Sequence, residues 1–171
     1  MKIFLTGYRC TGKTTIGQLL AKSKSIDFLD IDQVIEKESK LNIAQIVKNN
    51  GWDNFRYLEK KALFNTKHSD NMIIATGGGI IIDPDNCKFI KENGFCIWLD
   101  ADCNTIIKRL KNDFTTSLSR PSLTQYNLLK ETKEILKNRR PLYEKCSHAK
   151  IDTSYKTPQE IVNLINNQVP G

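Results

Sequence analysis

The sequence predicts an α/β domain in which a parallel β-sheet is covered by helices on both faces. Short apolar runs alternate along the chain with longer segments that have helical periodicity and helix-capping residues. This alternation is typical of parallel strands joined by helical crossovers. The expected strands span 3–6, 27–29, 72–75, 95–99 and 149–151. The 171 residues fit a single domain, 1–171, with a core large enough to fold alone.

The first expected strand leads directly into GYRCTGKT, residues 7–14, which matches the phosphate-loop pattern G-x-x-x-x-G-K-[ST] without departure. The following segment, TTIGQLLAK, has helical periodicity, which gives the strand–loop–helix context that the motif requires. Glycines let successive backbone N–H groups face phosphate oxygens, and the helix N-terminus adds partial positive charge. We therefore expect a nucleoside triphosphate site in which Lys13 reaches the β- and γ-phosphates and the Thr14 hydroxyl binds Mg²⁺.

The second expected strand ends in FLDID, which places Asp30 and Asp32 on the same side of the chain. Ligands of parallel α/β sheets bind at the carboxyl ends of the strands, so both carboxylates should face the phosphates. We expect Asp30 to help hold Mg²⁺ and Asp32 to accept the proton of an attacking hydroxyl. Two alternatives stay open. Asp32 could instead cap the helix that follows it. Asp100 in CIWLD could be the metal ligand in place of Asp30, or it could belong with Asp102 to the cap of the next helix.

A helix is expected from a cap at Asn42 to a stop at Gly51, and NFRYLEKKAL follows it. In that segment Arg56 and Glu59 are three residues apart and therefore share one helix face. An arginine oriented by a neighbouring carboxylate is suited to bidentate capture of a ligand carboxylate or phosphate. The alternative is a surface ion pair without a ligand.

Three consecutive glycines, Gly77, Gly78 and Gly79, separate two aliphatic runs in IIATGGGIII. Such a run raises the entropy of the unfolded chain and offers no side chain to pack, and a structural turn rarely needs more than one glycine. We therefore expect bare backbone here to admit a ligand. The next helix, in DPDNCKFIKENG, is expected to have its cap at Asp83 and Pro84 at its first position.

The segment 112–125 is polar and is broken by Pro121, which predicts a long loop of the kind that often forms a lid. Arg120 in this lid could close over a transferring phosphate and exclude water. Beyond it, LKNRRPLYEK supplies Arg139 and Arg140 in a helical stretch. The last helix is expected to begin at the capping box in TPQEIVNLI.

Composition narrows the partners and the compartment. The formal net charge is +7, but the lysines are spread along the chain, which indicates a solvated surface and no nucleic-acid partner. The five cysteines form no CxxC pair, so neither a zinc site nor a disulfide framework is indicated. The apolar run at the N-terminus is too short for a signal peptide or a membrane span, and we expect a cytoplasmic protein.

The phosphate loop alone leaves open a switch, a motor, a transporter subunit and a kinase. The sequence contains no N-K-x-D guanine motif, and 171 residues leave little room for the coupling domains of a motor. A small-molecule kinase is therefore the economical hypothesis. The alternative from another functional class is a nucleotide-binding or nucleic-acid-binding protein without catalytic activity. The presence of the expected site residues argues against it, namely Lys13, Thr14, Asp30, Asp32 and Arg120.

Taken together and in this order, the motifs resemble those of the shikimate kinases, most closely the bacterial type II subgroup. The resemblance covers nearly the whole chain, in GYRCTGKTT, FLDIDQVIE, NIAQIVKNNGWDNFRYLEKKAL, IIATGGGIII, SRPSL and RRPLYEKCSHAKID. It implies a three-layer phosphate-loop kinase fold with a five-stranded parallel sheet in the order 2-3-1-4-5, a substrate-binding segment at about 32–60 and a mobile lid at about 111–126. It also implies a monomer that uses ATP and Mg²⁺ to phosphorylate shikimate at its 3-hydroxyl, in chorismate and aromatic amino acid biosynthesis.

The resemblance also implies roles for individual residues. The ATP phosphates would lie against Cys10, Thr11, Gly12, Lys13, Thr14 and Thr15. Thr14 and Asp30 would bind Mg²⁺. The catalytic residues would be Lys13, Asp32 and the lid residue Arg120, and Arg120 would also contact the nucleotide phosphates. Shikimate would contact Asp32, Arg56, Gly77, Gly78, Gly79 and Arg139, with the two arginines on its carboxylate. Arg109 and Pro158 are expected to enclose adenine.

Two departures concern the lid. The lid arginine is usually followed by Pro-Leu-Leu, whereas this chain has Pro121, Ser122 and Leu123, and the stretch 109–120 is longer than in many relatives. Gluconate kinases and nucleotide kinases share the phosphate loop and the lid. They do not account for Arg56, the glycine triplet and Arg139 together.

Overall fold

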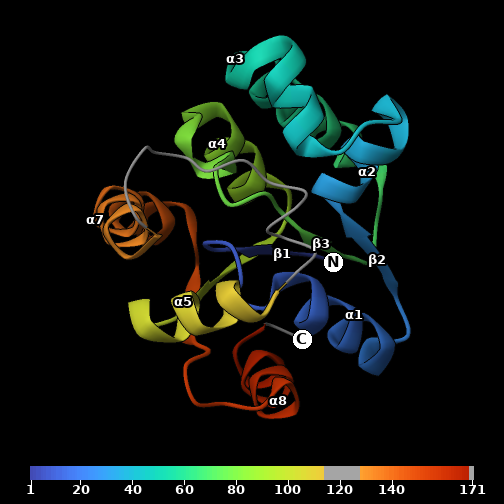
Figure 1. The fold of residues 1–171 in the computed structure, drawn as a ribbon. Coiled ribbons are helices and arrows are strands. Elements are labelled where there is room, and N and C mark those ends of the chain that lie inside the picture. The colour runs from blue at the N-terminus through green and yellow to red at the C-terminus, as the bar shows by residue number, and fades with distance from the viewer. Residues whose placement is uncertain (114–127, 170–171) are drawn as a thin grey trace.

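The computed structural model describes residues 1–113 and 128–169. Its centre is a five-stranded parallel sheet in the order β2-β3-β1-β4-β5 (Figure 1). The strands are β1 (Lys2–Thr6), β2 (Asp27–Asp30), β3 (Met72–Ala75), β4 (Phe95–Asp100) and β5 (Ala149–Asp152). Each strand matches an expected apolar run to within one residue at either end, and the expected strand order is confirmed.

Helices alternate with the strands throughout the described part of the chain. They are α1 (Lys13–Lys24), α2 (Ile31–Ser39), α3 (Ile43–Asn65), α4 (Pro84–Asn93), α5 (Cys103–Asn112), α7 (Leu128–Cys146) and α8 (Pro158–Gln168). Short 3₁₀ turns lie at η1 (Thr66–His68) and η2 (Ile80–Ile82). No helix in residues 1–113 or 128–169 combines the length and the apolar character needed to cross a membrane.

The expected helix caps are present, and the helix that begins at Asn42 is interrupted at Gly51, as expected. Asn42 and Thr157 form capping boxes, and the Asp83 side chain accepts a hydrogen bond from the first turn of α4. Gly51 ends the first helical segment of α3, because its φ of 79° and ψ of 171° are not helical, and a second helical segment follows directly after this kink. The left-handed φ is available to glycine at little steric cost.

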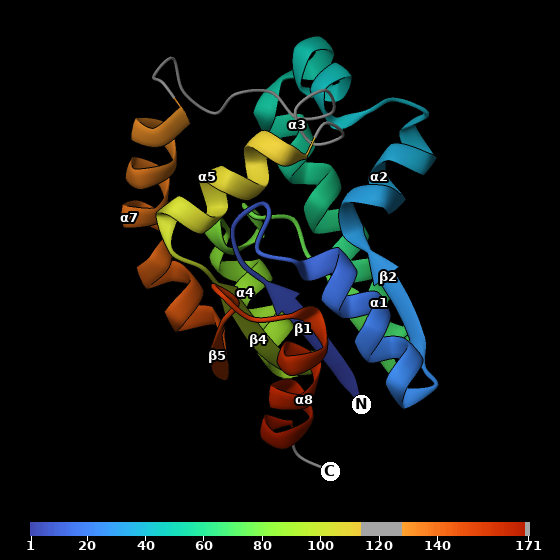
Figure 2. The ribbon, with the colours of Figure 1, turned by 60° about the horizontal axis from the view of Figure 1, so that its bottom comes forward.

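The two faces of the sheet carry two separate apolar clusters. On β1, Phe4 faces a cluster formed with α2, α3, α4 and α7, while Ile3 and Leu5 face a cluster formed with α1 and α8. Figure 1 shows α3 and α4 above the sheet and α1 with α8 below it, and Figure 2 shows α8 beside the sheet from a second direction. Because both faces are covered, the strands are apolar on both sides, which explains the continuous apolar runs in the sequence.

The strand register brings three connecting segments to one edge of the sheet. Leu5 of β1 is the parallel partner of Ala75 of β3, and Asp30 of β2 is also opposite Ala75. The phosphate loop, the FLDID turn and the glycine triplet therefore leave the sheet at neighbouring carboxyl ends. This edge is where ligands of open α/β sheets bind.

Candidate functional site

The phosphate loop joins β1 to α1 and folds around the Lys13 side chain. Lys13 Nζ donates hydrogen bonds to the carbonyl oxygens of Gly7 (2.9 Å) and Tyr8 (2.8 Å). Gly7 has a φ of +144°, and a Cβ there would lie 2.2 Å from the Leu99 carbonyl oxygen, so the position requires glycine. Gly12, the residue before α1, has a φ of +96°. The loop thus presents bare backbone and a helix N-terminus to one cavity, as a phosphate site requires.

Asp30 uses its two carboxylate oxygens for two different contacts. Oδ1 accepts hydrogen bonds from the backbone N–H groups of Asp32 (3.0 Å) and Gln33 (3.4 Å), which makes Asp30 the N-cap of α2. Oδ2 accepts a hydrogen bond from the Thr14 hydroxyl at 2.7 Å. Burial, followed by the neighbouring Asp32, raises the pKa of Asp30 above its usual value. The alternative that Asp32 caps the helix is therefore wrong, since the cap is Asp30.

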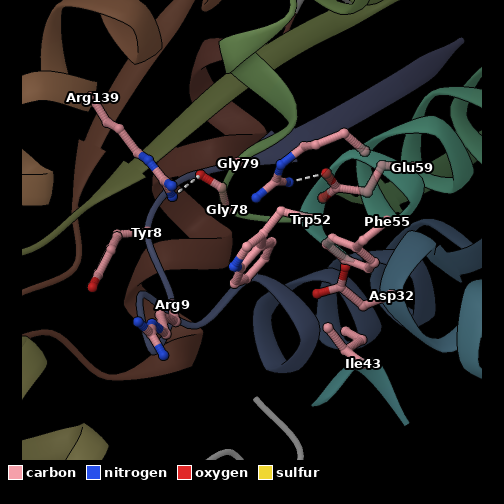
Figure 3. Close-up of a pocket in the computed structure, with 11 residues that line it drawn as sticks. Tyr8, Arg9, Asp32, Ile43, Trp52, Phe55, Glu59, Gly78, Gly79 and Arg139 are labelled. Atoms are coloured by element: carbon pink, nitrogen blue, oxygen red, sulfur yellow. Dashed lines mark hydrogen bonds and ion pairs between the residues drawn. The ribbon is translucent and has the colours of Figure 1, made fainter. Parts of the chain in front are cut away.

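Asp32 lies in the first turn of α2, where its side chain is 7% exposed. It lines a cavity formed with the phosphate-loop residues Cys10, Gly12, Lys13, Thr14 and Thr15. It also lines a second pocket, which we call the substrate pocket (Figure 3). The substrate pocket is bounded by Tyr8, Arg9, Asp32, Ile43, Trp52, Phe55, Arg56, Glu59, Gly78, Gly79 and Arg139. Asp32, the expected proton acceptor, therefore lies between the phosphate-loop cavity and the substrate pocket.

Arg56 and Glu59 form an ion pair inside the substrate pocket and not on the surface. Arg56 Nη1 donates to Glu59 Oε2, and the Glu59 side chain is 1% exposed. The Arg56 guanidinium carbon lies 5.3 Å from the ring centre of Trp52 and 5.2 Å from that of Phe55. Two rings and one carboxylate thus hold the arginine fork in one place. The surface-pair alternative is wrong because Trp52 and Phe55 enclose the pair.

Glu59 is a buried carboxyl group of the pocket with a raised pKa. Burial raises its pKa to about 7, the neighbouring Arg56 opposes the rise, and Asp32 adds to it. Burial thus favours the protonated form of Glu59 more than in an exposed glutamate. A group of this kind beside an arginine and a second carboxylate is typical of functional sites.

The glycine triplet leaves space for the side chains of this pocket. A Cβ on Gly77 would lie 2.0 Å from Glu59 Oε1 and 3.0 Å from Asp32 Oδ1, and a Cβ on Gly79 would lie 2.4 Å from Arg56 Nη2. None of the three glycines has a positive φ, so backbone conformation does not explain them. Gly77 and Gly79 are bare because Glu59, Asp32 and Arg56 fill the space that their Cβ atoms would need, whereas a Cβ on Gly78 would meet only the backbone of residues 7–9.

Arg139 reaches the same pocket from α7. Its Nη1 donates a hydrogen bond to the Gly78 carbonyl oxygen at 3.1 Å, and the buried Tyr143 hydroxyl donates to the same oxygen at 2.5 Å. Figure 3 shows Arg139 on the side of the pocket opposite Trp52, Phe55 and Glu59. Gly78 therefore fixes Arg139 through its carbonyl group, and two arginines face the pocket from opposite sides.

Arg109 and Pro158 line a third cavity, which also borders Cys10, Gly12 and Thr15 of the phosphate loop. Arg109 Nη1 donates to the carbonyl oxygen of Cys10 at 3.2 Å, and Arg109 Nη2 donates to that of Thr153 at 2.7 Å. Thr11 lies inside the loop, fully buried, with its hydroxyl on the Tyr8 carbonyl oxygen.

Residues 9–170 match the family model for shikimate kinase. The chain belongs to the shikimate kinase family. It is 37% identical to the shikimate kinase of Rhodopirellula baltica over 99% of this chain and 90% of that protein. It is 39% identical to the enzyme of Persephonella marina, with 95% of each chain covered. The structure of Acinetobacter baumannii shikimate kinase in complex with shikimate matches it with a TM-score of 0.89 at 28% identity, over 99% of this chain and 95% of that one.

As a shikimate kinase, the chain is a phosphotransferase with the phosphate-loop kinase fold, and both expectations are confirmed. Asp100, the competing metal ligand, instead pairs with Lys150 (3.0 Å) and Arg140 (3.4 Å). Asp102 is the N-cap of α5, as the alternative for that region held. Arg120 and the lid beyond residue 113 lie outside the described residues.

Sequence reasoning missed several residues of the substrate pocket of this shikimate kinase. Tyr8 and Arg9 lie within the phosphate loop, where the motif leaves the residue types unspecified. Trp52 and Phe55 lie on α3 one turn before Arg56 and Glu59, and their helical spacing was the available signal for a shared face. Ile43 closes the pocket from the first turn of α3.

Proposed function

We propose that this chain transfers the γ-phosphoryl group of ATP to the 3-hydroxyl group of shikimate. The observation that carries the proposal is the position of Asp32. It lines both the phosphate-loop cavity and the pocket that holds Arg56 and Arg139. A hydroxylated ring held by its carboxylate in that pocket can present a hydroxyl group to Asp32 and to the phosphates at the same time.

Shikimate recognition rests on two arginines and one glycine. The planar forks of Arg56 and Arg139 suit bidentate capture of the substrate carboxylate from opposite sides. Gly78 lines the pocket with backbone, so the ring can approach this residue without meeting a side chain of it. Gly79 also lines the pocket, and its missing Cβ leaves room for the Arg56 guanidinium. Gly77 contributes indirectly, since its missing Cβ leaves room for Glu59 and Asp32.

The transfer follows from the positions of Asp32 and Lys13. Asp32 accepts the proton of the 3-hydroxyl as a bond forms between the substrate oxygen and the γ-phosphorus. The bond from the γ-phosphorus to the bridging oxygen of ADP breaks in line with it. Lys13, which in the ligand-free loop bonds to backbone carbonyls, turns to the phosphate oxygens and stabilises their charge. We assign Arg120 the same task from the lid.

Thr14 and Asp30 have the donor chemistry of a magnesium site. The hydroxyl and carboxylate oxygens lie 2.7 Å apart beside the phosphate loop, and both are oxygen donors of the kind that Mg²⁺ prefers. Mg²⁺ usually takes one or two protein ligands and completes its shell with phosphate oxygens and water. Among residues 1–113 and 128–169 there is no cluster of three or more His, Cys, Asp and Glu side chains arranged to hold a metal ion. Bound there, Mg²⁺ would neutralise charge on the transferring phosphates.

The nucleotide would lie with its phosphates on residues 10–15 and its base in the cavity between Arg109 and Pro158. The protein would work as a single domain and as a monomer in the cytoplasm, with shikimate and ATP as its partners and no nucleic acid or membrane. A monomer is supported by the origin of the pocket residues, since the phosphate loop, α2, α3 and α7 of one chain supply both arginines and Asp32.

The test is ADP release by the purified protein with shikimate, gluconate and nucleoside monophosphates in parallel. Shikimate alone should raise the rate above the control without acceptor, and phosphorus NMR should place the phosphate on the 3-oxygen. Rates with shikimate equal to that control would overturn the proposal. Asp32→Asn should lower turnover by a factor on the order of 10². Asp102→Asn, which keeps a capping side chain on α5, should retain wild-type turnover.

A further inference from the structure

Arg9 and Asp32 are the two residues, within the part of the chain that the structure describes, that line both the phosphate-loop cavity and the substrate pocket. One is a cation and the other an anion. Figure 3 shows Arg9 beside Tyr8, on the side of the pocket away from Asp32, Trp52 and Phe55. A phosphoryl group that passes from ATP to the acceptor must cross the space that these two cavities share.

A buried carboxylate on another element holds Arg9 in this position. Arg9 Nη2 lies 3.0 Å from Glu131 Oε1, and the two side chains are 12% and 4% exposed. Glu131 belongs to the first turn of α7, 122 residues away in sequence. Because water reaches neither group freely, the pair is weakly screened and its geometry is well defined.

The ion pair leaves donors of the guanidinium free for a ligand. An arginine has five N–H donors, and the contact to Glu131 uses one nitrogen. Arg9 Nε is buried and finds no hydrogen-bond partner among the described residues. A buried donor without a partner is costly unless a ligand satisfies it. The substrate carboxylate already has Arg56 and Arg139, so an anion between the two cavities is the remaining candidate.

We propose that Arg9 is a further catalytic residue, which contacts the transferring phosphoryl group, and that Glu131 is a positioning residue that orients Arg9. The proposal rests on the proposed function. The charge on the equatorial oxygens of the phosphoryl group persists through transfer, and Arg9 stabilises it from the side opposite Asp32. Arg9 therefore also binds the phosphate of the product, shikimate 3-phosphate, and contributes little to binding shikimate itself.

The test compares wild type, Arg9→Met, Glu131→Gln and the double variant, with Arg9→Lys as the conservative variant that keeps the charge. The readouts are kcat, and the dissociation constants of shikimate and shikimate 3-phosphate. Arg9→Met should lower kcat about 100-fold and weaken the binding of shikimate 3-phosphate about tenfold. The binding of shikimate should change less than threefold. Arg9→Lys should recover part of kcat. Glu131→Gln should lower kcat in the wild type but less than twofold in the Arg9→Met background, because it acts through Arg9.

Arg140→Met is the matched control, since Arg140 is another partly buried arginine, bonded to Asp100 and Ala101 and outside both cavities. It should keep wild-type kcat. A kcat of Arg9→Met within threefold of the wild-type value overturns the proposal. An equal loss of affinity for shikimate and for shikimate 3-phosphate also overturns it. Full additivity of the two substitutions overturns the role of Glu131. If Arg9→Met does not fold, Arg9→Lys and Glu131→Gln give the same comparison. A wild type without activity on shikimate refutes the proposed function itself, which separates the two failures.

Discussion

Gly79→Ala should weaken shikimate binding by displacing Arg56. A Cβ at this position would lie 2.4 Å from Nη2 and 2.5 Å from both Cζ and Nη1 of Arg56. Carbon and nitrogen atoms in contact need roughly 3.5 Å, so the guanidinium must retreat by about 1 Å. The far end of an arginine can make such a shift, so the variant should fold. The ion pair with Glu59 and the rings of Trp52 and Phe55 leave the fork no equivalent position in the pocket.

The expected loss of shikimate affinity can be estimated from one charge-assisted hydrogen bond. A hydrogen bond to a charged group contributes roughly 1.5–3 kcal/mol, which corresponds to about 10- to 150-fold in affinity. Isothermal titration should therefore show shikimate binding weakened by that factor. ATP binding should stay within twofold, because Gly79 and Arg56 do not line the phosphate-loop cavity. The midpoint of thermal unfolding reports whether the variant is otherwise intact.

The decisive control repeats the substitution where Arg56 is already absent. In an Arg56→Ala background, Gly79→Ala should change shikimate affinity less than twofold, since the displaced group is gone. If Gly79→Ala in the wild type leaves shikimate affinity unchanged, or if the two losses are additive, steric displacement of Arg56 is the wrong explanation of the glycine.

Three further outcomes are expected. Because burial raises the pKa of Glu59 from 4.5 to about 7, the folded protein binds this proton more tightly than the unfolded chain. The free energy of unfolding should therefore fall as pH rises between these values, by at most roughly 3 kcal/mol, and Glu59→Gln should remove that slope in urea titrations. Asp30→Asn keeps a capping side chain and should raise the Mg²⁺ concentration for half-maximal activity with little change in unfolding temperature. Asp30→Ala should also cost about 1 kcal/mol of stability, and equal unfolding temperatures for the two would contradict the cap. Arg139→Ala should weaken shikimate binding at least tenfold, whereas Arg140→Ala should not. Equal effects of the two substitutions in binding assays would count against the assignment of Arg139.

The fold could be predicted from the sequence because its signals are local. A parallel strand covered on both faces reads as a continuous apolar run, and each of the five strands was found in this way to within one residue. Caps depend on side chains within three residues of the helix start, so Asn42, Asp83 and Thr157 were also predictable. The helix end at Gly51 was predictable for the same reason, but the helical segment that follows it directly depends on packing in three dimensions. Here Phe55 and Ala62 of the continued helix join the core.

The candidate site shows the same difference between local and long-range signals. Local motifs were sufficient to predict the phosphate loop, Asp30, Asp32 and Arg56, because the spacing of residues within a short segment indicates their function. Arg9 was missed because its partner Glu131 is 122 residues away and the loop motif specifies neither residue. The distance between them in sequence leaves no periodicity or spacing to detect, so only the packing of α7 against the phosphate loop reveals the pair.

The charges that line the substrate pocket also fit its expected ligand. Among the described residues, Arg9, Arg56 and Arg139 supply three positive charges, and Asp32 with Glu59 supplies two negative charges when both are ionised, which leaves one net positive charge. A buried site with a net charge favours a ligand of the opposite charge, because burying an uncompensated charge is costly. Shikimate brings one carboxylate. The arriving phosphoryl group adds further negative charge, which Lys13 and the helix N-terminus of the phosphate loop face from the adjoining cavity. We therefore expect Arg56 and Arg139 to bind the carboxylate, while Arg9, Lys13 and the helix N-terminus of the phosphate loop face the phosphoryl group.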